Sequence, residues 1–477
     1  MNVQPATQRL TMQFTTPLNS IDTLFTNAIA DFHHHKNVNT LCEQMRDELF
    51  TLVEAFLCPI VENVLCDPEL LPELKTGAAT KGLRFHGYRS TSIQLLTGKS
   101  LKLKSPYFAK SKDKHRPGPK PKKRENGTGR HFGLDYLGFI GRCSAFLGSL
   151  VVQATLLCPS FELARRTLQS HAIDLNVKTI HRITMDHAKE AMPERGRISL
   201  SDTDRVEKKT VLVCIDGGRL RERRAKRGRK RKDQKRQGYH TDWKEPIQFV
   251  IHTVAQDGTI IKDHLPLYDA TMGGVDAAFE LLGTYLHELN ISKADRVVFC
   301  CDGARSYWKR TRPLIERLGI TTHYEVIDYT HAKQNLHEIL DKLPQKIAAQ
   351  EKRRITETWK NLLWKGKFTE LKKEIKKHIS YPKKRKEALS KFNSYFTKNK
   401  SRMQYTTFQQ LGIPTGSGCV ESAIRRVINL RLKAPGTFWK RETAESMLFL
   451  RNLLLSGRWN IMTSNIFKNF RSLCECH

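Results

Sequence analysis

The chain has 477 residues, and its 82 Lys and Arg against 48 Asp and Glu leave a formal net charge of +34 at pH 7. A hydrophobic content of 39% is enough for packed cores, so a disordered basic tail is excluded, and the length allows about two to four domains. So large an excess of positive charge indicates a polyanionic partner, of which nucleic acid is the commonest.

A membrane-spanning chain is not expected. Spanning needs about 20 nearly uninterrupted apolar residues, and the longest apolar stretch, Leu137 to Cys158, contains Arg142 and Gln153; we expect it to form a buried helix. The N-terminus lacks the charged start and apolar stretch of a secretion signal. The 11 cysteines follow no disulfide spacing, which indicates a reducing cytoplasm.

Residues 1–80 have apolar positions three and four apart, which predicts helices that form a packing or oligomerisation unit. In residues 81–135, alternating apolar and polar residues around Thr97 and Gly98 predict a β-hairpin. The segment from Lys110 to Arg130 has too many charges, prolines and glycines to be buried, so we expect a flexible basic linker there.

Residues 136–200 are expected to form a helix-turn-helix. One helix is predicted up to about Ser170 and a second from Val177, a spacing that suits this DNA-binding motif. Two helices packed at an angle in a helical domain are the alternative, which the positive charge of the chain disfavours. The residues that would face a DNA groove are Lys178, Thr179, His181 and Arg182.

Residues 205–344 change to a strand pattern, in which two segments are apolar on both faces, as buried central strands are. Three consecutive strands, followed by strands that alternate with helices, predict a mixed α/β sheet. The predicted strands are Thr210–Asp216, Ile247–Ala255, Thr259–Tyr268, Arg296–Asp302 and His323–Asp328, and the predicted helices run from Val275 to Asn290 and from about Tyr307 to Leu318.

Residues 345–404 are Lys-rich and helical in pattern, which predicts an inserted helical unit. The α/β pattern resumes in residues 405–460 with a glycine-rich lead into a helix, and a further helix is expected around Glu442 to Leu455. Residues 461–477 are expected to form a tail.

The two central strands both end in Asp-Gly, at Asp216 and at Asp302. A carboxylate there is held rigidly at the sheet edge, and the glycine lets the chain turn away. Asp at one strand end is ordinary turn chemistry, but two on neighbouring strands suit Mg²⁺, which binds through one or two acidic groups. A two-metal site needs a third acid, and we assign Glu421, on the first turn after Thr415-Gly416-Ser417-Gly418. The alternative is that Glu421 only pairs with Arg425.

The chain resembles the bacterial insertion-sequence transposases of the DDE superfamily, closest to the Kra-type branch, in four segments that occur in the same order: VCIDGGRLR, VFCCDGARSYW, IDYTHAKQNL and GSGCVESAIRRVINLRLKAPGTFWKRETAESMLFLRN. The similarity covers roughly Val211 to Trp459 and, more weakly, the hairpin and helix-turn-helix. It implies an RNase H-like catalytic domain interrupted by the helical insertion, with Asp216, Asp302 and Glu421 as the metal-binding triad. The cysteine pair that often follows the hairpin in this family is missing from residues 105–120, so no zinc site is expected there.

The resemblance implies an enzyme that cleaves the ends of its insertion sequence and joins the 3′-hydroxyl to target DNA, using two Mg²⁺ ions, with Mn²⁺ as an alternative. Its partners would be double-stranded DNA, both the terminal inverted repeats and the target. We expect a homo-oligomer, at least a dimer, in the bacterial cytoplasm at the nucleoid. Asp328 and His331 could reach the same pocket, although a satisfied polar turn is an equal alternative.

The densest positive charge follows the first catalytic strand, from Arg219 to Arg236. Such a run is usually a solvated loop, but beside a phosphate-cleaving site it would contact DNA phosphates. Trp439 could stack on an unpaired base, with core packing as the favoured alternative. The basic side chains assigned to DNA in these regions are Arg219, Arg221, Arg223 and Arg224, and on the helix of Glu421 they are Arg425, Arg426, Arg431 and Lys433.

Two other classes of function stay open at this point. One is a helix-turn-helix regulator on an inactive transposase fold, which would not need carboxylates beside bound phosphates. The other is a metal-dependent nuclease that cuts DNA without joining it.

Overall fold

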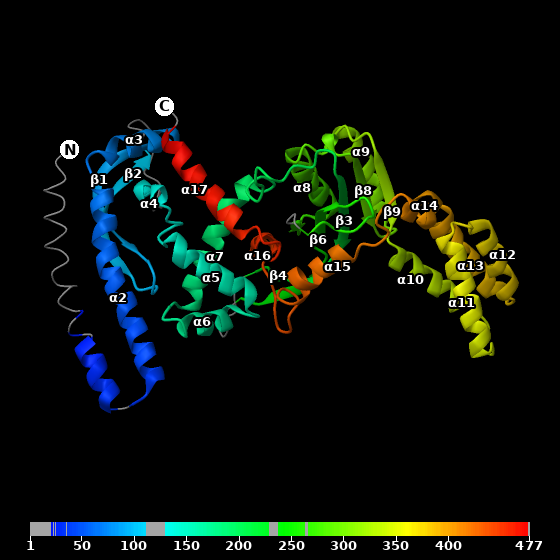
Figure 1. Ribbon diagram of the computed structural model, residues 1–477, viewed down its shortest axis with the longest axis horizontal. Coiled ribbons are helices and arrows are strands. Elements are labelled where there is room, and N and C mark those ends of the chain that lie inside the picture. Colours follow the sequence, from blue (N-terminus) through cyan, green and yellow to red (C-terminus); the bar gives the residue numbers. More distant parts are fainter. Residues whose placement is uncertain are drawn as a thin grey trace. The chain divides into compact units, whose positions relative to one another are not determined.

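The computed structural model describes residues 21, 23, 25–34, 36–110, 129–228, 237–262 and 266–475 (Figure 1). The chain divides into two compact units, one of Met1–Pro193 with Thr463–His477, the other of Glu194–Met462. The basic linker expected between Lys110 and Arg130 lies almost wholly outside the described residues.

The first unit contains the predicted β-hairpin, in which β1 and β2 are antiparallel and Ile93 pairs with Leu101. Buried Glu54 of α2 fixes the turn, because its carboxylate accepts hydrogen bonds from the backbone N–H groups of Leu96 and Thr97 at 2.7 and 2.8 Å. It also accepts the hydroxyl of Thr97 at 2.7 Å. The elements are α2 (Val38–Leu65), α3 (Leu70–Thr80), β1 (Leu83–Ile93) and β2 (Leu101–Lys110).

Four helices follow the hairpin, and two of them lie close to the boundaries predicted for the helix-turn-helix. Each of the three longer helices begins at a side-chain cap, provided by Ser144, Ser160 and Asn176. The expectation of one helix across Leu137–Cys158 was wrong at its start, because the helix begins only after Ser144. The elements are α4 (Phe132–Tyr136), α5 (Ala145–Leu157), α6 (Phe161–Gln169) and α7 (Val177–Ala191), and α5, α6 and α7 pack on one another.

No single helix among the described residues is long and apolar enough to cross a membrane. The helices α2 and α3 pass the length and composition test only as a pair, and they meet at a bend of 74°.

The second unit is built on a mixed five-stranded sheet with the strand order β7-β6-β3-β8-β9. The first three strands along the chain pair antiparallel, and β8 and β9 run parallel to β3. This confirms the predicted mixed α/β sheet. The strands of this unit are β3 (Thr210–Gly217), β4 (Leu220–Ala225), β5 (Tyr239–Lys244), β6 (Ile247–Val254), β7 (Leu267–Thr271), β8 (Arg296–Cys301) and β9 (His323–Ile327).

One strand differs from its prediction. The strand expected over Thr259–Tyr268 forms only from Leu267 onward. The Asp257 side chain accepts hydrogen bonds from both the N–H and the hydroxyl of Thr259, at 2.9 and 2.7 Å, which makes a turn, and Ile260 forms only an isolated bridge.

The start of the basic run is also not a loop. Residues 220–225 form β4, which pairs with β5 and, through Arg221 and Arg223, with the backbone of Trp439. The alternating burial of Leu220 and Glu222 anchors this hairpin. Residues 229–236 lie outside the described part of the chain.

Helices cover the sheet and form the insertion (Figure 1). The helix α8 packs on β6 and β7, α15 packs on β3 and β6, and α16 packs on β7. They are α8 (Gly274–Glu288), α9 (Arg305–Arg317), α10 (Tyr329–Leu340), α11 (Ala349–Trp364), α12 (Phe368–His378), α13 (Pro382–Phe392), the π-helix η3 (Asn393–Thr397), α14 (Tyr405–Gln410), α15 (Gly418–Ile424), the π-helix η5 (Arg425–Asn429), α16 (Arg441–Leu455) and α17 (Trp459–Glu475).

The inserted helical unit is confirmed as helical, and it is tied to β9. Arg402 forms an ion pair with Glu325 at 2.6 Å, and the hydroxyl of Tyr405 donates to the carbonyl of Ile327 at 3.1 Å. The expected C-terminal tail is instead helical in α17, because Trp459, Met462 and Ile466 give it a buried face.

A buried ion pair joins the sheet of the second unit to two other segments. Asp269 of β7 is fully buried and binds Arg195 through two hydrogen bonds of 2.8 and 2.7 Å. Arg195 also pairs with Glu445 of α16 at 2.6 Å, and Tyr285 of α8 donates to Asp269 at 3.1 Å. Removing one partner of such a pair leaves a buried charge uncompensated.

We therefore predict that Asp269→Asn lowers the free energy of unfolding by about 3 to 5 kcal/mol, measured by urea denaturation followed by circular dichroism. The matched control is Glu351→Gln, which removes a carboxylate from an exposed pair with Arg354. Its denaturation midpoint should not move measurably. Equal losses in both variants would contradict the structural role of the buried pair.

Candidate active site

The parallel pairing of β3 with β8 brings two aspartates to the same sheet edge. Cys214 pairs with Cys300 and Ile215 with Cys301, so the next residues in register are Asp216 and Asp302. The strands before them are buried, whereas both aspartates are partly exposed. The sequence prediction that these two acids lie on neighbouring strands is confirmed.

The two aspartates are held by local hydrogen bonds. One carboxylate oxygen of Asp216 accepts the N–H of Gly217 at 2.7 Å, and one of Asp302 accepts the N–H of Ala304 at 2.9 Å. The indole N–H of Trp308 donates to the carbonyl of Asp302 at 2.9 Å. Each carboxylate therefore keeps an oxygen that can bind a ligand.

Glu421 and His331 lie close enough to Asp216 to affect the pKa of its carboxyl group. Burial is the main cause that raises the pKa of Asp216 to about 6, and the negative charges of Asp302 and Glu421 raise it further, against the N–H of Gly217 and the charge of His331. Raised carboxyl pKa values from clustered acids are a feature of functional sites.

Glu421 lies on the first turn of α15 with 49% of its side chain exposed. Its Oε1 is 3.9 Å from Nε2 of His331. No ion pair joins Glu421 to Arg425 among the described residues, so the alternative pairing along the helix is not formed.

Asp328 has a positioning role. It is 1% exposed, and one oxygen accepts the N–H of His331 at 3.0 Å at the start of α10. The other oxygen accepts both the backbone N–H and the hydroxyl of Ser417, the latter at 2.8 Å. Since Ser417 precedes the helix of Glu421, Asp328 holds together the two segments that carry His331 and Glu421.

A cluster of three thiols joins β3, β8 and α15. The thiol of Cys214 donates toward Cys300 and Cys419, and these hydrogen bonds together with complete burial raise the pKa of Cys214. The cluster therefore connects the start of α15 to the two strands that end in aspartate.

The insertion contributes a residue that the sequence did not indicate. A side chain at Gly303 would collide with the ring of Tyr395, whose Cε2 lies 2.2 Å from the position of a Cβ atom. The hydroxyl of Tyr395 is buried and has no hydrogen-bond partner in the described part of the chain. Burial and the charges of Asp302 and Asp328 raise its pKa. No local pattern in the sequence could place it here.

Among the described residues, no group of three or more His, Cys, Asp or Glu side chains is already close enough together to hold a metal ion. The donors present are nevertheless of the type that Mg²⁺ prefers, since Asp216 and Asp302 offer carboxylate oxygens from a rigid edge. Burial, and after it repulsion from Asp302 and Glu421, raises the pKa of Asp216, and a bound cation would favour the charged form of this carboxyl group. The residues thus fit a divalent cation.

A basic and aromatic hairpin, β4 with β5, directly follows Asp216. Trp243 is 50% exposed and Tyr239 is 45% exposed. The guanidinium groups of Arg219 and Arg221 each lie 5.6 Å from the ring of Trp243. Sequence reasoning missed these aromatic residues because it treated the segment as a loop. Of the other arginines assigned to DNA here, Arg223 is exposed near Tyr239 and Arg224 pairs with Asp242.

The basic residues after Glu421 divide into exposed and buried ones. Arg425 and Lys433 are exposed, and Arg426 donates to the hydroxyl of Tyr268 at 2.8 Å. Arg431 is only 2% exposed and lies 5.2 Å from the ring of Trp439. Trp439 itself is buried and its indole donates to a backbone carbonyl. In this structure neither of the last two is accessible to DNA. The expectation that Arg431 contacts DNA is corrected to core packing, and Trp439 adopts the core packing that was its favoured alternative, not the base stacking for which it was assigned to DNA.

The four residues assigned to the DNA groove have different surroundings on α7. Lys178 is exposed, and the ring of His181 lies tilted against that of Phe161 with centroids 5.3 Å apart. Thr179 and Arg182 line a cavity beside the hairpin.

Comparison with solved structures finds a distant structural likeness. The solved chain belongs to the Drosophila P element transposase strand transfer complex, at 11% sequence identity and a TM-score of 0.23, covering 68% of this chain and 81% of that one. No protein-family profile matches the chain, and no curated protein matches it.

Proposed function

We propose that the chain is a DNA transposase that cleaves the ends of its element and joins the 3′-hydroxyl to target DNA. The observation that carries the proposal is the meeting of Asp216 and Asp302 at one sheet edge within the electrostatic reach of Glu421. Phosphoryl transfer needs acidic residues there, because they hold the metal ions that neutralise the reacting phosphate.

The proposal includes an RNase H-like catalytic domain, made of residues 205–344 and 405–460 and interrupted by the insertion. The mixed sheet supports it, since three antiparallel strands precede two parallel ones. So does the anchoring of the insertion to the strand end beside Asp302, through Tyr395.

Asp216, Asp302 and Glu421 would hold the Mg²⁺ ions, with Asp216 and Asp302 as the rigid pair. Bound Mg²⁺ would lower the pKa of the attacking water or hydroxyl and stabilise charge on the phosphate. Glu421 is half exposed at the start of α15, and its carboxylate would complete the set of ligands. His331, 3.9 Å from Glu421, is placed to orient that carboxylate or to bind the phosphate as a cation.

The protein's own charges would guide DNA to this edge. The hairpin β4–β5 carries arginines and the exposed rings of Tyr239 and Trp243, a combination that binds phosphates and stacks on unpaired bases. We propose double-stranded DNA, as inverted repeats and as target, for the partner.

Oligomerisation is also part of the proposal, with at least two copies acting on the two ends of an element. The helix α2 supports it, because apolar side chains on it are left exposed in the described structure. They are Val38, Leu49, Phe50, Val53, Ile60 and Val64.

We predict that Asp216→Asn, Asp302→Asn and Glu421→Gln each reduce cleavage of element-end DNA roughly 100-fold or more, because each removes a carboxylate that would hold the metal ions. Binding of the same DNA should change little. The assay uses the repeats that flank the coding region, a plasmid target and Mg²⁺, with cut and joined products resolved on a gel.

The matched control is Glu442→Gln, which changes an exposed acid on the first turn of another helix, α16. It should keep wild-type activity. Substantial cleavage by one of the three variants would remove that residue from the triad. Cleavage by the wild type without joined products would identify a nuclease, and binding without cleavage a regulator.

A second prediction concerns the pH dependence of stability. The folded pKa of Asp216, about 6, is above the ordinary value of 3.8, so its contribution to stability is full below pH 3.8 and is lost as the pH rises through 6. Asp216→Asn does not titrate. The free energy of unfolding of the variant, relative to that of the wild type, should therefore increase by on the order of 1 to 2 kcal/mol as the pH rises from about 4 to 6. Thermal and urea denaturation measure this difference.

Added Mg²⁺ at pH 8 should raise the melting temperature of the wild type and raise that of Asp216→Asn much less, because a ligand stabilises only the state that binds it. Identical Mg²⁺ shifts in the two proteins would contradict metal binding at Asp216, whatever the activity.

A further inference from the structure

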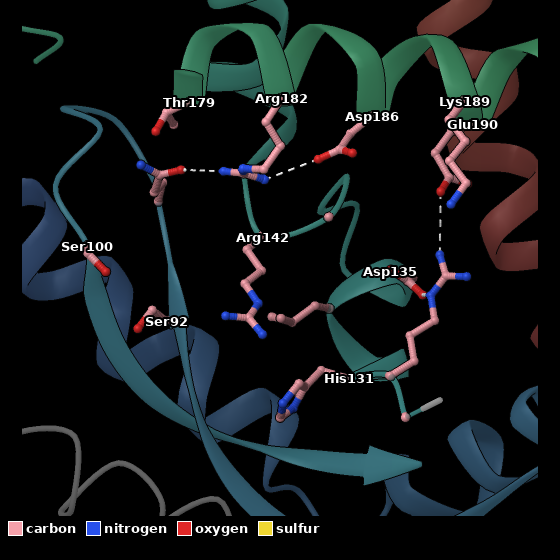
Figure 2. A pocket seen from close by; sticks show the side chains of 15 residues that line it. Ser92, Ser100, His131, Asp135, Arg142, Thr179, Arg182, Asp186, Lys189 and Glu190 are labelled. Carbon is pink, nitrogen blue, oxygen red and sulfur yellow. Dashed lines mark hydrogen bonds and ion pairs between the residues drawn. The ribbon is translucent and has the colours of Figure 1, made fainter. Parts of the chain in front are cut away.

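A polar cavity of 740 Å³ lies in the first unit, between the β1–β2 hairpin and α7 (Figure 2). Its size is within the usual range for ligand sites. It lies in a different unit from the three carboxylates, and the proposed chemistry does not use it. What it would bind can be argued from its charges.

The acids of the cavity are already neutralised by ion pairs. Asp135 is buried and pairs with Arg130 at 2.5 Å, and Arg130 also reaches Glu190 at 3.5 Å. Asp186 pairs with Arg182 at 3.1 Å. Each of the three carboxylates that line the cavity is thus in an ion pair, and Asp135 and Glu190 share Arg130.

Two cations of the lining have no such partner among the described residues. Arg142 is exposed, makes no ion pair there, and extends into the space between α7 and His131 (Figure 2). Lys189 is likewise exposed and unpaired on the last turn of α7. Counting all four cations and three carboxylates, the lining has a net charge of +1, and its two unpaired cations are available to bind an anion.

Neutral donors accompany these cations. The hydroxyls of Ser92, Ser100 and Thr179 line the cavity without a hydrogen-bond partner in the described structure. Cations together with hydroxyl donors are the groups that proteins use to bind phosphate oxygens.

The walls of the cavity are rigid. Gln94 of the hairpin exchanges backbone hydrogen bonds with Arg142 and Ser144, and its side chain accepts from Arg182 at 3.2 Å. Gly141 lets the loop approach the Arg182–Asp186 pair, since a Cβ there would lie 3.1 Å from Asp186 Oδ2. The site is therefore preorganised rather than formed on binding.

We propose that this cavity binds a phosphate group, with Arg142 and Lys189 as its charged ligands. The source that the position beside α7 favours is a phosphodiester of bound DNA, an assignment that rests on the proposed DNA-binding function; free inorganic phosphate is the other source of the same chemistry. Thr179 and Arg182 would then help to bind the DNA phosphate backbone and would not contact the bases.

The test compares the full-length wild type with Arg142→Gln, Lys189→Gln and Arg142→Lys. The control is Arg84→Gln, which removes an exposed arginine of the same hairpin outside the cavity. The affinity for a fluorescent DNA duplex is measured by anisotropy over a range of KCl concentrations. Binding of radiolabelled inorganic phosphate is measured by equilibrium dialysis, and melting curves identify variants that do not fold.

We expect the salt slope of DNA binding to fall by about 0.9 in each Gln variant, and to stay unchanged in Arg142→Lys and Arg84→Gln. Bound phosphate should be lost in the Gln variants. If phosphate binding depends on Arg142 while the salt slopes of DNA binding do not change, the cavity is a phosphate site, but its phosphate does not come from DNA. If the wild type binds phosphate but no DNA, the proposed function fails and the site stands.

Unchanged DNA slopes together with no phosphate binding would overturn the proposal, as would an equal fall of the slope in Arg84→Gln. Should Arg142→Gln not fold, Lys189→Gln, on an exposed helix position, decides the same question.

Discussion

The parallel pairing of β3 with β8 is the constraint on which the proposed site depends. A slip of one residue in register would turn the side chains of a strand to the opposite faces. Because both strands are buried, such a slip would disrupt their packing. The register is therefore fixed, and Asp216 and Asp302 must leave the sheet at the same edge. Burial disfavours the charge of Asp216, and repulsion from Asp302 adds to the cost, which raises the pKa of Asp216. Under the proposed function, a bound cation would offset this cost.

The rest of the second unit positions groups around that edge. Asp328 connects the start of α10 to Ser417, and the thiol cluster connects α15 to the two central strands. Through them His331 and Glu421 arrive from segments about 90 residues apart. The chain has a net charge of +34. The β4–β5 hairpin, which follows Asp216 in the sequence, carries part of this charge. The polyanion indicated by composition would be drawn to the place where its phosphates could react.

The sequence predicted those features that depend on local patterns. Strands apolar on both faces revealed β3 and β8, and Asp-Gly at their ends revealed the acid pair, while Glu421 needed a family resemblance as well. The β4–β5 hairpin was missed because the Arg- and Lys-rich run from Arg219 to Arg236 was interpreted as a loop. Tyr395 was missed because its contact with Gly303 joins residues about 90 positions apart. Arg431 was assigned to DNA by type, whereas it is buried beside the ring of Trp439. Tertiary contacts, and not local pattern, decided these positions.

The most direct measurement of the central claim is anomalous diffraction from crystals soaked in Mn²⁺, which replaces Mg²⁺ at oxygen sites. The account predicts a peak within coordination distance of both Asp216 and Asp302, roughly 2.0 to 2.3 Å from their oxygens, and none at that place in crystals of Asp216→Asn. A peak elsewhere only, or no peak at this sheet edge in the wild type at saturating Mn²⁺, would contradict it.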